Sequence, residues 1–550
     1  MLPPRPARLA ALLVGAVGLL VCLFLWRPAA PDPASSSPVA ENAAAQPTAA
    51  REAAPPPEAG LVPPDRDLAR LLRAIARGAA RPQEALLSFR DDASLHRFLA
   101  RASAAGFNVL GQIPALRAVR VGFADAGALA RERAAFASEH AAFDPNSLFA
   151  VPRPPAREDR PAIEPVPFGN NALSFLGATG DRSAWGRGTL VAVLDTGVAP
   201  DPTFGQGRLR TLDLGLGTAP GRGEDDGHGT AVAALVAGGS PEAPGVAPAA
   251  TLLSIRVTDA TGTSDLFTIA QALVAAVDSG ARIINVSLGG YATGGALDSA
   301  LDYATRAGAV VVAAAGNDQA AQLAWPAADS RVLSVGAVDR AEQQVSFSNS
   351  GPQLQLSAPG FAVQTAWLDG DRVLVSGTSA SAPLVAGAVA AVVSQHPGTT
   401  PAQAAALLLA TASDAGAPGA DPDFGRGILN LGSALHRDQP TYVDTAVSSH
   451  HFDPVRSELQ VVVQNRGGGT ASGLTLAVEA TGTTSTQAIP ALAPGAIHVV
   501  TLAVSSASLR EAGSLTFTTT LANAPGAIDA APANNRRTST LSAPTASPRP

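Results

Sequence analysis

The sequence lacks lysine altogether and contains a single cysteine among its 550 residues. All 38 basic residues are arginine, and the formal net charge is −7, so no basic surface favours nucleic acid as a partner. The single cysteine, Cys22, excludes an intramolecular disulfide framework and a cysteine-rich metal site. Stability outside the cell, where disulfides usually contribute, would then depend on large cores or on bound ions.

Glycine and proline, by contrast, are abundant, with 53 and 45 residues respectively. This composition indicates many turns and some unstructured linkers. The length of the chain suits two to four domains.

An uncharged apolar run of 18 residues, Leu9–Trp26, follows Arg5 and Arg8. This length just reaches that of a membrane span, whereas the core of a cleavable signal peptide is usually shorter. The arginines before the run belong in the cytoplasm, so the rest of the chain would be exported. The sequence therefore favours an N-terminal signal anchor at 9–26, and a cleaved signal peptide is the alternative.

Two segments separate this run from the main body of the chain. Residues 27–80 are rich in alanine, proline and serine and predict a linker, with a short amphipathic helix near residues 68–75. Residues 82–145 predict a small α+β unit with the order β-α-β-β-α. Its expected strands are EALLSF and two strands around a turn at Ile113–Pro114, and its expected helices are SLHRFLARASAAG and DAGALARERAAF.

Apolar runs alternate with helix-like segments over residues 165–437. TLVAVL, LLSIRV, ARIINVS, AVVVAAA and RVLSVGA have the length of strands and are mostly apolar. Such strands separated by helices predict an α/β domain, with a parallel sheet that carries helices on both faces. Beyond Pro440 the helical periodicity ends, and residues 441–543 predict an all-β sandwich of strands rich in valine and threonine.

Four polar residues follow the expected strands and loops of the α/β domain. Asp195 follows TLVAVL, and Asn317 follows AVVVAAA and a glycine. His228 follows the loop GRGEDDG, and Ser379 comes shortly after the strand-like RVLVSG, at the start of a long apolar helix. Because ligands bind outside the carboxyl ends of parallel strands, we expect these four side chains to meet at one edge of the sheet.

A carboxylate, an imidazole, a hydroxyl and an amide have a known combined use. A serine becomes an effective nucleophile when a neighbouring base takes its proton, and histidine has a suitable pKa for that task. A carboxylate holds the tautomer of the imidazole and stabilises its charged form, and a carboxamide stabilises the oxyanion of a tetrahedral intermediate. The pattern therefore predicts acyl transfer by a serine nucleophile.

Each of these residues also has a purely structural reading. Asp195 in DTG and Asn317 after glycine are common turn residues, and a serine at a helix start is a common cap. His228 differs because Gly227 and Gly229 on either side carry no side chains and let other groups approach closely. The other seven histidines have no comparable surroundings.

Four segments in order resemble the signature segments of the subtilases, the subtilisin-like serine proteases of the peptidase S8 type: VAVLDTGV, DDGHGTAVA, AAAGN and SGTSASAPLVAG. The resemblance covers about residues 168–435, the whole expected α/β region. The sedolisins share a similar serine segment but carry a glutamate where this chain has His228, so GHGT favours the subtilases. The order Asp, His, Ser along the chain is also that of subtilisin.

By this resemblance, Asp195 is the orienting carboxylate, His228 the general base and Ser379 the nucleophile, and Asn317 is the oxyanion-hole donor. Two further segments resemble the backbone strands between which subtilases hold a peptide substrate by strand addition. They are Ser287, Leu288, Gly289 and Gly290, and Ala313, Ala314, Ala315 and Gly316.

The resemblance extends to the flanking units. The unit at 82–145 resembles the inhibitory propeptide of subtilases, which implies a self-processing zymogen with its own propeptide as an intramolecular inhibitor. The expected sandwich resembles the CARDB class of bacterial immunoglobulin-like domains, through QNRGGGTASG, LAPG and Asn534–Asn535, which implies adhesion or substrate binding. The catalysis requires no cofactor. Many subtilases hold structural calcium, but no ligand set can be matched here, so the metal-binding residues stay unassigned.

The sequence thus predicts an exported serine endopeptidase that acts on proteins or peptides through an acyl-enzyme intermediate. Its precursor would be anchored by residues 9–26, with the catalytic part outside the cytoplasm. The mature form would be secreted if the chain is cut between about residues 145 and 168. Two alternatives stay open: a catalytically silent surface scaffold or adhesion protein that binds through its sandwich, and an esterase or peptide ligase that uses the same acyl-enzyme.

Overall fold

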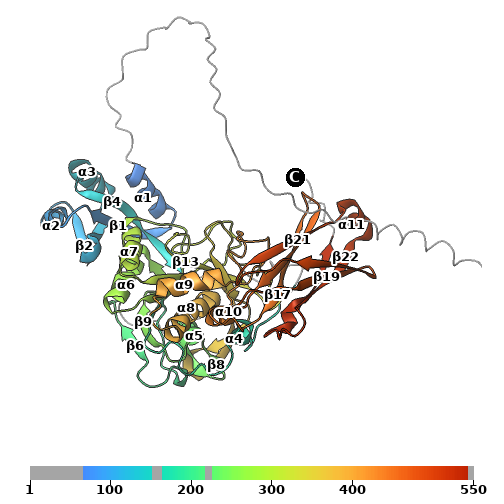
Figure 1. The fold of residues 1–550 in the computed structure, drawn as a ribbon. Coiled ribbons are helices and arrows are strands. Elements are labelled where there is room, and N and C mark those ends of the chain that lie inside the picture. Colours follow the sequence, from blue (N-terminus) through green and yellow to red (C-terminus); the bar gives the residue numbers. More distant parts are fainter. Residues whose placement is uncertain (1–65, 152–163, 217–225, 260, 543–550) are drawn as a thin grey trace, which may run out of the picture.

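The computed structural model describes residues 66–151, 164–216, 226–259 and 261–542, which form three units (Figure 1). The expected anchor at 9–26, most of the linker at 27–80 and the last eight residues lie outside the described residues. Within the described part of the chain, one helix is long and apolar enough to cross a membrane, α8 (Thr378–Gln395), and it is 83% buried inside the protein. It is therefore a core helix of the central unit.

The N-terminal unit is an antiparallel sheet in the order β4-β1-β3-β2, and its helices pack against this sheet around a core rich in phenylalanine. The sequence placed the end of this unit at residue 145, whereas its last strand continues to Ala150. The letters FDPNS, typical of a turn, conceal this strand in the sequence. The elements are α1 (Arg66–Ala76), β1 (Ala80–Phe89), α2 (Asp92–Arg101), β2 (Phe107–Ile113), β3 (Ala118–Phe123), α3 (Ala126–Phe136) and β4 (His140–Ala150).

The central unit has the expected α/β fold. Seven strands, all parallel, lie in the order β14-β13-β12-β11-β5-β9-β6. After β5 the chain forms β6 and β9 on one side of it and then β11 to β14 on the other, which creates a crevice at the carboxyl end of β5. The strands are β5 (Leu190–Asp195), β6 (Leu209–Leu212), β9 (Thr251–Arg256), β11 (Ile283–Val286), β12 (Val310–Ala314), β13 (Leu333–Val338) and β14 (Leu356–Pro359).

Helices cover both faces of this sheet, as the apolar strands predict. Side chains alternate along a strand, so in β5 Val191 and Val193 join one core, while Ala192 and Leu194 join the other. The first core holds α5, α8, α9 and α10, and the second holds α6 and α7. The helices are α4 (Ala172–Phe175), α5 (His228–Ala237), α6 (Leu266–Asp278), α7 (Gly295–Arg306), α8, α9 (Pro401–Ala410) and α10 (Leu431–Leu435).

The N-terminal unit lies on the side of α6 and α7 (Figure 1). Apolar side chains from its sheet enter the second core, among them Leu86, Ile113 and Phe149. The two units therefore share one hydrophobic core, which removes apolar surface of both from water.

We expected the serine segment to follow a strand of the parallel sheet, but it does not. Arg372–Val375 (β16) pairs with Val363–Ala366 (β15) in a separate antiparallel hairpin, and α8 begins just beyond it. Both strands are short and largely apolar, so their composition does not distinguish a hairpin from a sheet strand. Ser379 therefore reaches the sheet edge from the start of α8.

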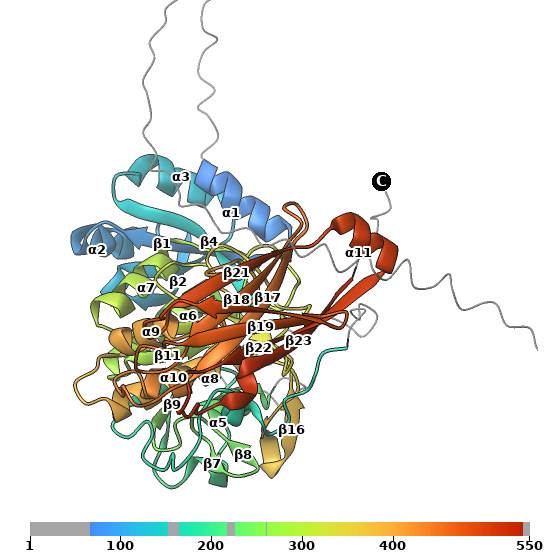
Figure 2. The ribbon, with the colours of Figure 1, turned by 45° about the vertical axis from the view of Figure 1, so that its right-hand side comes forward.

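The C-terminal unit is a β-sandwich, as expected, with sheets β17-β18-β21 and β20-β19-β22-β23 packed over one core (Figure 2). A polar interface joins it to the central unit: Gln464 donates to the carbonyl of Ala412 at 2.9 Å, and Arg537 pairs with Glu342 at 2.6 Å. The elements are β17 (Thr445–Asp453), β18 (Glu458–Asn465), β19 (Leu474–Ala480), β20 (Thr483–Ile489), β21 (Ile497–Ala503), α11 (Ser506–Ala512), β22 (Ser514–Ala522) and β23 (Arg536–Ser542).

Candidate active site

Asp195 and His228 meet at the carboxyl end of the central strand. Asp195 is the last residue of β5, and His228 is the first residue of α5. The Nδ1 atom of His228 lies 2.7 Å from Oδ1 of Asp195, and the carboxylate is fully buried. A buried carboxylate at this distance favours the proton on Nδ1 and leaves Nε2 as an acceptor.

Glycines make this approach feasible. A Cβ atom at Gly229 would overlap the carbonyl oxygen of Gly197, and one at Gly227 would overlap the indole of Trp367. The backbone N–H of Gly229 instead donates to the hydroxyl of Thr196 at 3.0 Å. The glycines around the histidine are therefore required for close packing, which agrees with the functional reading of GHGT.

Ser379 lies at the same edge, on the first turn of α8. Its hydroxyl donates to the carbonyl of Ser287 at 3.1 Å, and the hydroxyl of Ser287 donates to the carbonyl of Ser379 at 3.2 Å. In the sheet, Leu194 pairs with Val286, so the residues that follow them, Asp195 and Ser287, emerge side by side. Through Ser287, the serine is held beside the acid and the imidazole.

Asn317 is fixed by the residue before the serine. Its carbonyl oxygen accepts two hydrogen bonds from Thr378, one from the backbone N–H and one from the hydroxyl, both at 2.9 Å. This orients the carboxamide, because an oxygen held in this way turns the NH₂ group to the opposite side. Gly377, with φ of +147°, brings the backbone so near that a Cβ there would lie 2.9 Å from Nδ2 of Asn317. The structure therefore brings all four expected residues to one edge of the sheet.

The two segments expected to flank a substrate have different surroundings. Gly289 exchanges two backbone hydrogen bonds with Ala150 of β4, at 2.9 and 3.0 Å. Ala313 and Ala314 instead lie within the parallel sheet, and Ala315 bonds to Val335 and Ala324. Residues 148–150 of β4 have a second backbone partner on their other side, the strand β10 (Thr263–Asp265).

On the other side of β4 the backbone neighbour is β10, where 313–316 was expected, and the sequence did not indicate this strand. Its letters TSD are polar and follow a glycine, so they resemble a loop. Only Gly316 of the expected segment lines the cleft.

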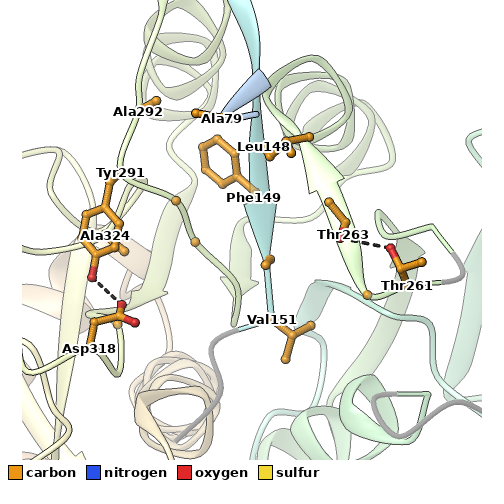
Figure 3. Close-up of a pocket in the computed structure, with 15 residues that line it drawn as sticks. Ala79, Leu148, Phe149, Val151, Thr261, Thr263, Tyr291, Ala292, Asp318 and Ala324 are labelled. Atoms are coloured by element: carbon orange, nitrogen blue, oxygen red, sulfur yellow. Dashed lines mark hydrogen bonds between the residues drawn. The ribbon is translucent and has the colours of Figure 1, made fainter. Parts of the chain in front are cut away.

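A cavity of about 700 Å³ runs along β4 between these walls (Figure 3). Figure 3 shows Phe149 of β4 directed toward Tyr291 of the central unit, with Thr263 on the opposite side of the strand. Tyr291 and Asp318, joined by a hydrogen bond, also line the cavity. Over the described ranges, no group of three or more His, Cys, Asp and Glu side chains is placed to hold a metal ion.

Comparison with known proteins identifies the central unit. The profile of the Subtilase family matches residues 186–427. A thermostable alkaline protease of Halalkalibacterium halodurans is 36% identical over 273 residues, which are 49% of this chain and 73% of that protein. Subtilisin Savinase of Lederbergia lenta is 34% identical over 271 residues, which are 49% of this chain and 98% of Savinase.

Solved structures share the fold over a larger part of the chain. Fervidolysin from Fervidobacterium pennivorans, described as a keratinolytic enzyme related to subtilisin, has a TM-score of 0.56 at 21% identity, and the match covers 85% of this chain and 77% of fervidolysin. At that identity the likeness shows the fold alone. The family profile and the two relatives above show that this chain belongs to the subtilase family, as a subtilisin-like serine endopeptidase that acts on proteins or peptides.

Proposed function

We propose that Ser379 is the nucleophile, His228 the general base and Asp195 the carboxylate that orients the base. Ser379 Oγ attacks the scissile carbonyl while His228 Nε2 takes its proton, and His228 then gives that proton to the leaving amine. Water, activated by the same imidazole, hydrolyses the acyl-enzyme. The single observation that carries this proposal is the 2.7 Å contact between Asp195 and His228, at the edge where Ser379 is held.

Asn317 and the backbone N–H of Ser379 form the proposed oxyanion hole. The two hydrogen bonds from Thr378 hold the carbonyl oxygen of Asn317 and so orient the carboxamide whose NH₂ group is the proposed donor. The start of α8 adds the positive end of its dipole near the developing charge. We propose that no cofactor takes part in the reaction. Structural calcium remains an expectation from the family, without assigned ligands.

The N-terminal unit is proposed to be an inhibitory propeptide. Its last strand lies between Gly289 and β10, as a peptide substrate bound by strand addition would. Two of its polar residues also meet helix starts of the central unit: Asp144 accepts from the N–H of Gly295 at 2.7 Å, and Asn146 accepts from that of Phe267 at 3.1 Å. These contacts support a unit that binds the cleft until the chain is cut beyond Val151.

The N-terminal apolar run and the C-terminal unit bear on where the enzyme acts. The apolar run at 9–26 with its preceding arginines supports export of the catalytic part from an anchored precursor. Cleavage in the segment after Val151 would separate the enzyme from that anchor and release it. We propose that the C-terminal unit is a CARDB-like sandwich that binds a surface or a substrate.

Labelling with a fluorophosphonate probe tests the catalytic proposal. Wild-type protein should be labelled and should hydrolyse casein, and Ser379→Ala should do neither. The purified Ser379→Ala chain should also stay full length if maturation is autocatalytic. An unlabelled wild-type protein without activity would instead support the silent scaffold, and normal trimming of the pure Ser379→Ala chain would exclude self-cleavage.

A further inference from the structure

A substrate strand in the place of β4 brings one of its residues next to Ser379. Ala150 of β4 pairs with Gly289, and two residues earlier on the same wall, Ser287 accepts the hydroxyl of Ser379. Residues of antiparallel strands oppose one another one by one. The substrate residue two positions beyond the one that pairs with Gly289 therefore lies opposite Ser287. We call it the P1 residue, because the bond that Ser379 attacks follows it.

A slot beside this position can receive the P1 side chain. Its walls are the backbone of Gly289 and Gly316, and its floor is the methyl group of Ala324. A Cβ on Gly289 would lie 2.9 Å from that methyl, and one on Gly316 would lie 3.3 Å from it. The floor is held to both walls, since Ala324 donates to Ala315 at 2.9 Å and Trp325 donates to Gly290 at 2.8 Å.

Tyr291 and Asp318 connect the walls of this slot. Tyr291 follows Gly290 on one wall, and Asp318 follows Asn317 on the other. The phenol of Tyr291 donates to Oδ2 of Asp318, and Figure 3 shows this bond on one side of the cavity that holds β4. Asn349 completes the arrangement: its Nδ2 donates to the phenol oxygen at 2.8 Å, and its Oδ1 accepts the backbone N–H of Asp318 at 2.9 Å.

Within the part of the chain that the structure describes, the carboxylate of Asp318 has no cationic partner. Among the ion pairs of residues 66–151, 164–216, 226–259 and 261–542, none includes Asp318. The pKa of Tyr291 is raised to about 12, first by burial and then by its bond to this carboxylate, so the phenol stays a donor at neutral pH. A negative charge therefore faces the cleft and is held in place by Tyr291.

We propose that Asp318, positioned by Tyr291, makes the enzyme prefer arginine or lysine as the P1 residue. The apolar stem of such a side chain lies along Ala324 and the ring of Tyr291, and its charged end reaches the carboxylate. A leucine or phenylalanine would place apolar atoms against Asp318 and remove water from it without a compensating bond. This inference rests on the proposed roles of Ser379 and Ser287 in the cleft.

Peptide substrates that differ only in the P1 residue test the proposal. The mature enzyme is assayed with arginine, lysine, leucine and phenylalanine at P1, and kcat and KM are measured for each. We expect wild type to prefer arginine over leucine, and Asp318→Asn to lower the ratio of their kcat/KM values about tenfold or more. Tyr291→Phe should lower the ratio about two- to fivefold, mainly by raising KM for arginine, because Asp318 loses its support.

A second pair of residues provides a matched control. The hydroxyl of Tyr303 in α7 donates to Asp278 at the end of α6 at 2.6 Å, in an exposed position, and neither residue lines the cavity. Asp278→Asn and Tyr303→Phe remove the same groups and should leave the arginine-to-leucine ratio unchanged. Salt gives a further readout, since 0.5 M NaCl should weaken the arginine preference of wild type but not that of Asp318→Asn.

The outcomes separate this inference from the proposed function. If wild type hydrolyses the peptides without preferring basic residues, or if Asp318→Asn lowers all four rates equally, the assignment of Asp318 is wrong and the catalytic proposal stands. If wild type hydrolyses none of them and resists the fluorophosphonate probe, the catalytic proposal fails. A ratio that falls only in the Asp318 and Tyr291 variants supports the inference.

Discussion

Replacement of Asp195 by asparagine removes a buried charge and keeps the shape of the side chain. Oδ1 of Asp195 accepts from the backbone N–H of Thr196 at 2.8 Å and lies 2.7 Å from His228 Nδ1. The carboxamide of asparagine has only one acceptor oxygen. If the oxygen of asparagine takes the place of Oδ1, it still accepts from both Thr196 and Nδ1, and only the charge is lost. If the NH₂ group takes that place, it faces Nδ1, and the imidazole must carry its proton on Nε2. In that tautomer His228 cannot take the proton of Ser379.

The expected magnitude follows from the charge and the tautomer. Two unit charges about 4 Å apart attract each other by about 4 kcal/mol at an effective dielectric constant of about 20. Loss of that attraction to the imidazolium formed in the transition state corresponds to a decrease of about 10³-fold in rate. We therefore expect kcat of Asp195→Asn to fall about 10³-fold, and up to about 10⁴-fold where the unfavourable tautomer also forms.

The assay compares purified Asp195→Asn with wild type on one peptide substrate. The variant is first freed of its N-terminal unit by immobilised wild-type enzyme, which is then removed. Asp201→Asn is the control, because Asp201 is also a buried carboxylate but pairs with Arg372, at 3.1 Å. It should lose stability while keeping kcat within about threefold of wild type. A loss below tenfold for Asp195→Asn, with an unchanged melting temperature, would refute the reasoning.

Four other outcomes follow from the site and the cores. Ser379→Ala should abolish hydrolysis of a denatured protein substrate, and activity at the wild-type rate would exclude Ser379 as the nucleophile. Asn317→Ala should lower kcat about a hundredfold or more, and an unchanged kcat would mean that another donor stabilises the oxyanion. Activity should rise between about pH 6 and 7, where histidine ordinarily titrates, because His228 must be neutral to accept a proton; a rate that is flat from pH 5 to 8 would contradict this. Burial raises the pKa of Asp414 to about 6, so stability is lost as pH rises from about 4 to above 6. Asp414→Asn should therefore raise the free energy of unfolding by about 1 to 3 kcal/mol at pH 8 and far less at pH 4 in thermal unfolding, and an equal gain at both values would be inconsistent with this cause.

The parallel sheet could be expected from the sequence because its strands are buried on both faces. A strand such as TLVAVL has no polar side to hide, so its composition alone separates it from a loop. The reverse holds for β4 and β10, whose polar letters serve contacts with other parts of the fold. Asp144 and Asn146 meet helix starts of the central unit, and Ser264 donates to the carbonyl of Val257 at 2.6 Å. Such polar residues resemble turns until their partners are known.

The two segments expected to flank a substrate, 287–290 and 313–316, also have partners that are far away in the sequence, so only the tertiary structure shows them. Both segments were expected at the cleft from the resemblance to the subtilases, and Gly289 and Gly290 of the first line the cavity. In the second, 313–316, three of the four residues are paired within the sheet or with Ala324. Tyr291 and Asp318 are 27 residues apart and gave no signal at all in the sequence.

By itself the sequence determined which segments are apolar strands, that glycines flank His228, and in which order acid, base and nucleophile occur. These features depend only on neighbours along the chain. Only the tertiary structure decided that the start of α8 reaches the edge from outside the sheet, that β4 lies in the cleft between Gly289 and β10, and that a carboxylate stands at the P1 slot. Each of these is a contact between segments far apart in the chain, and such contacts are set by how the cores pack and not by local preference.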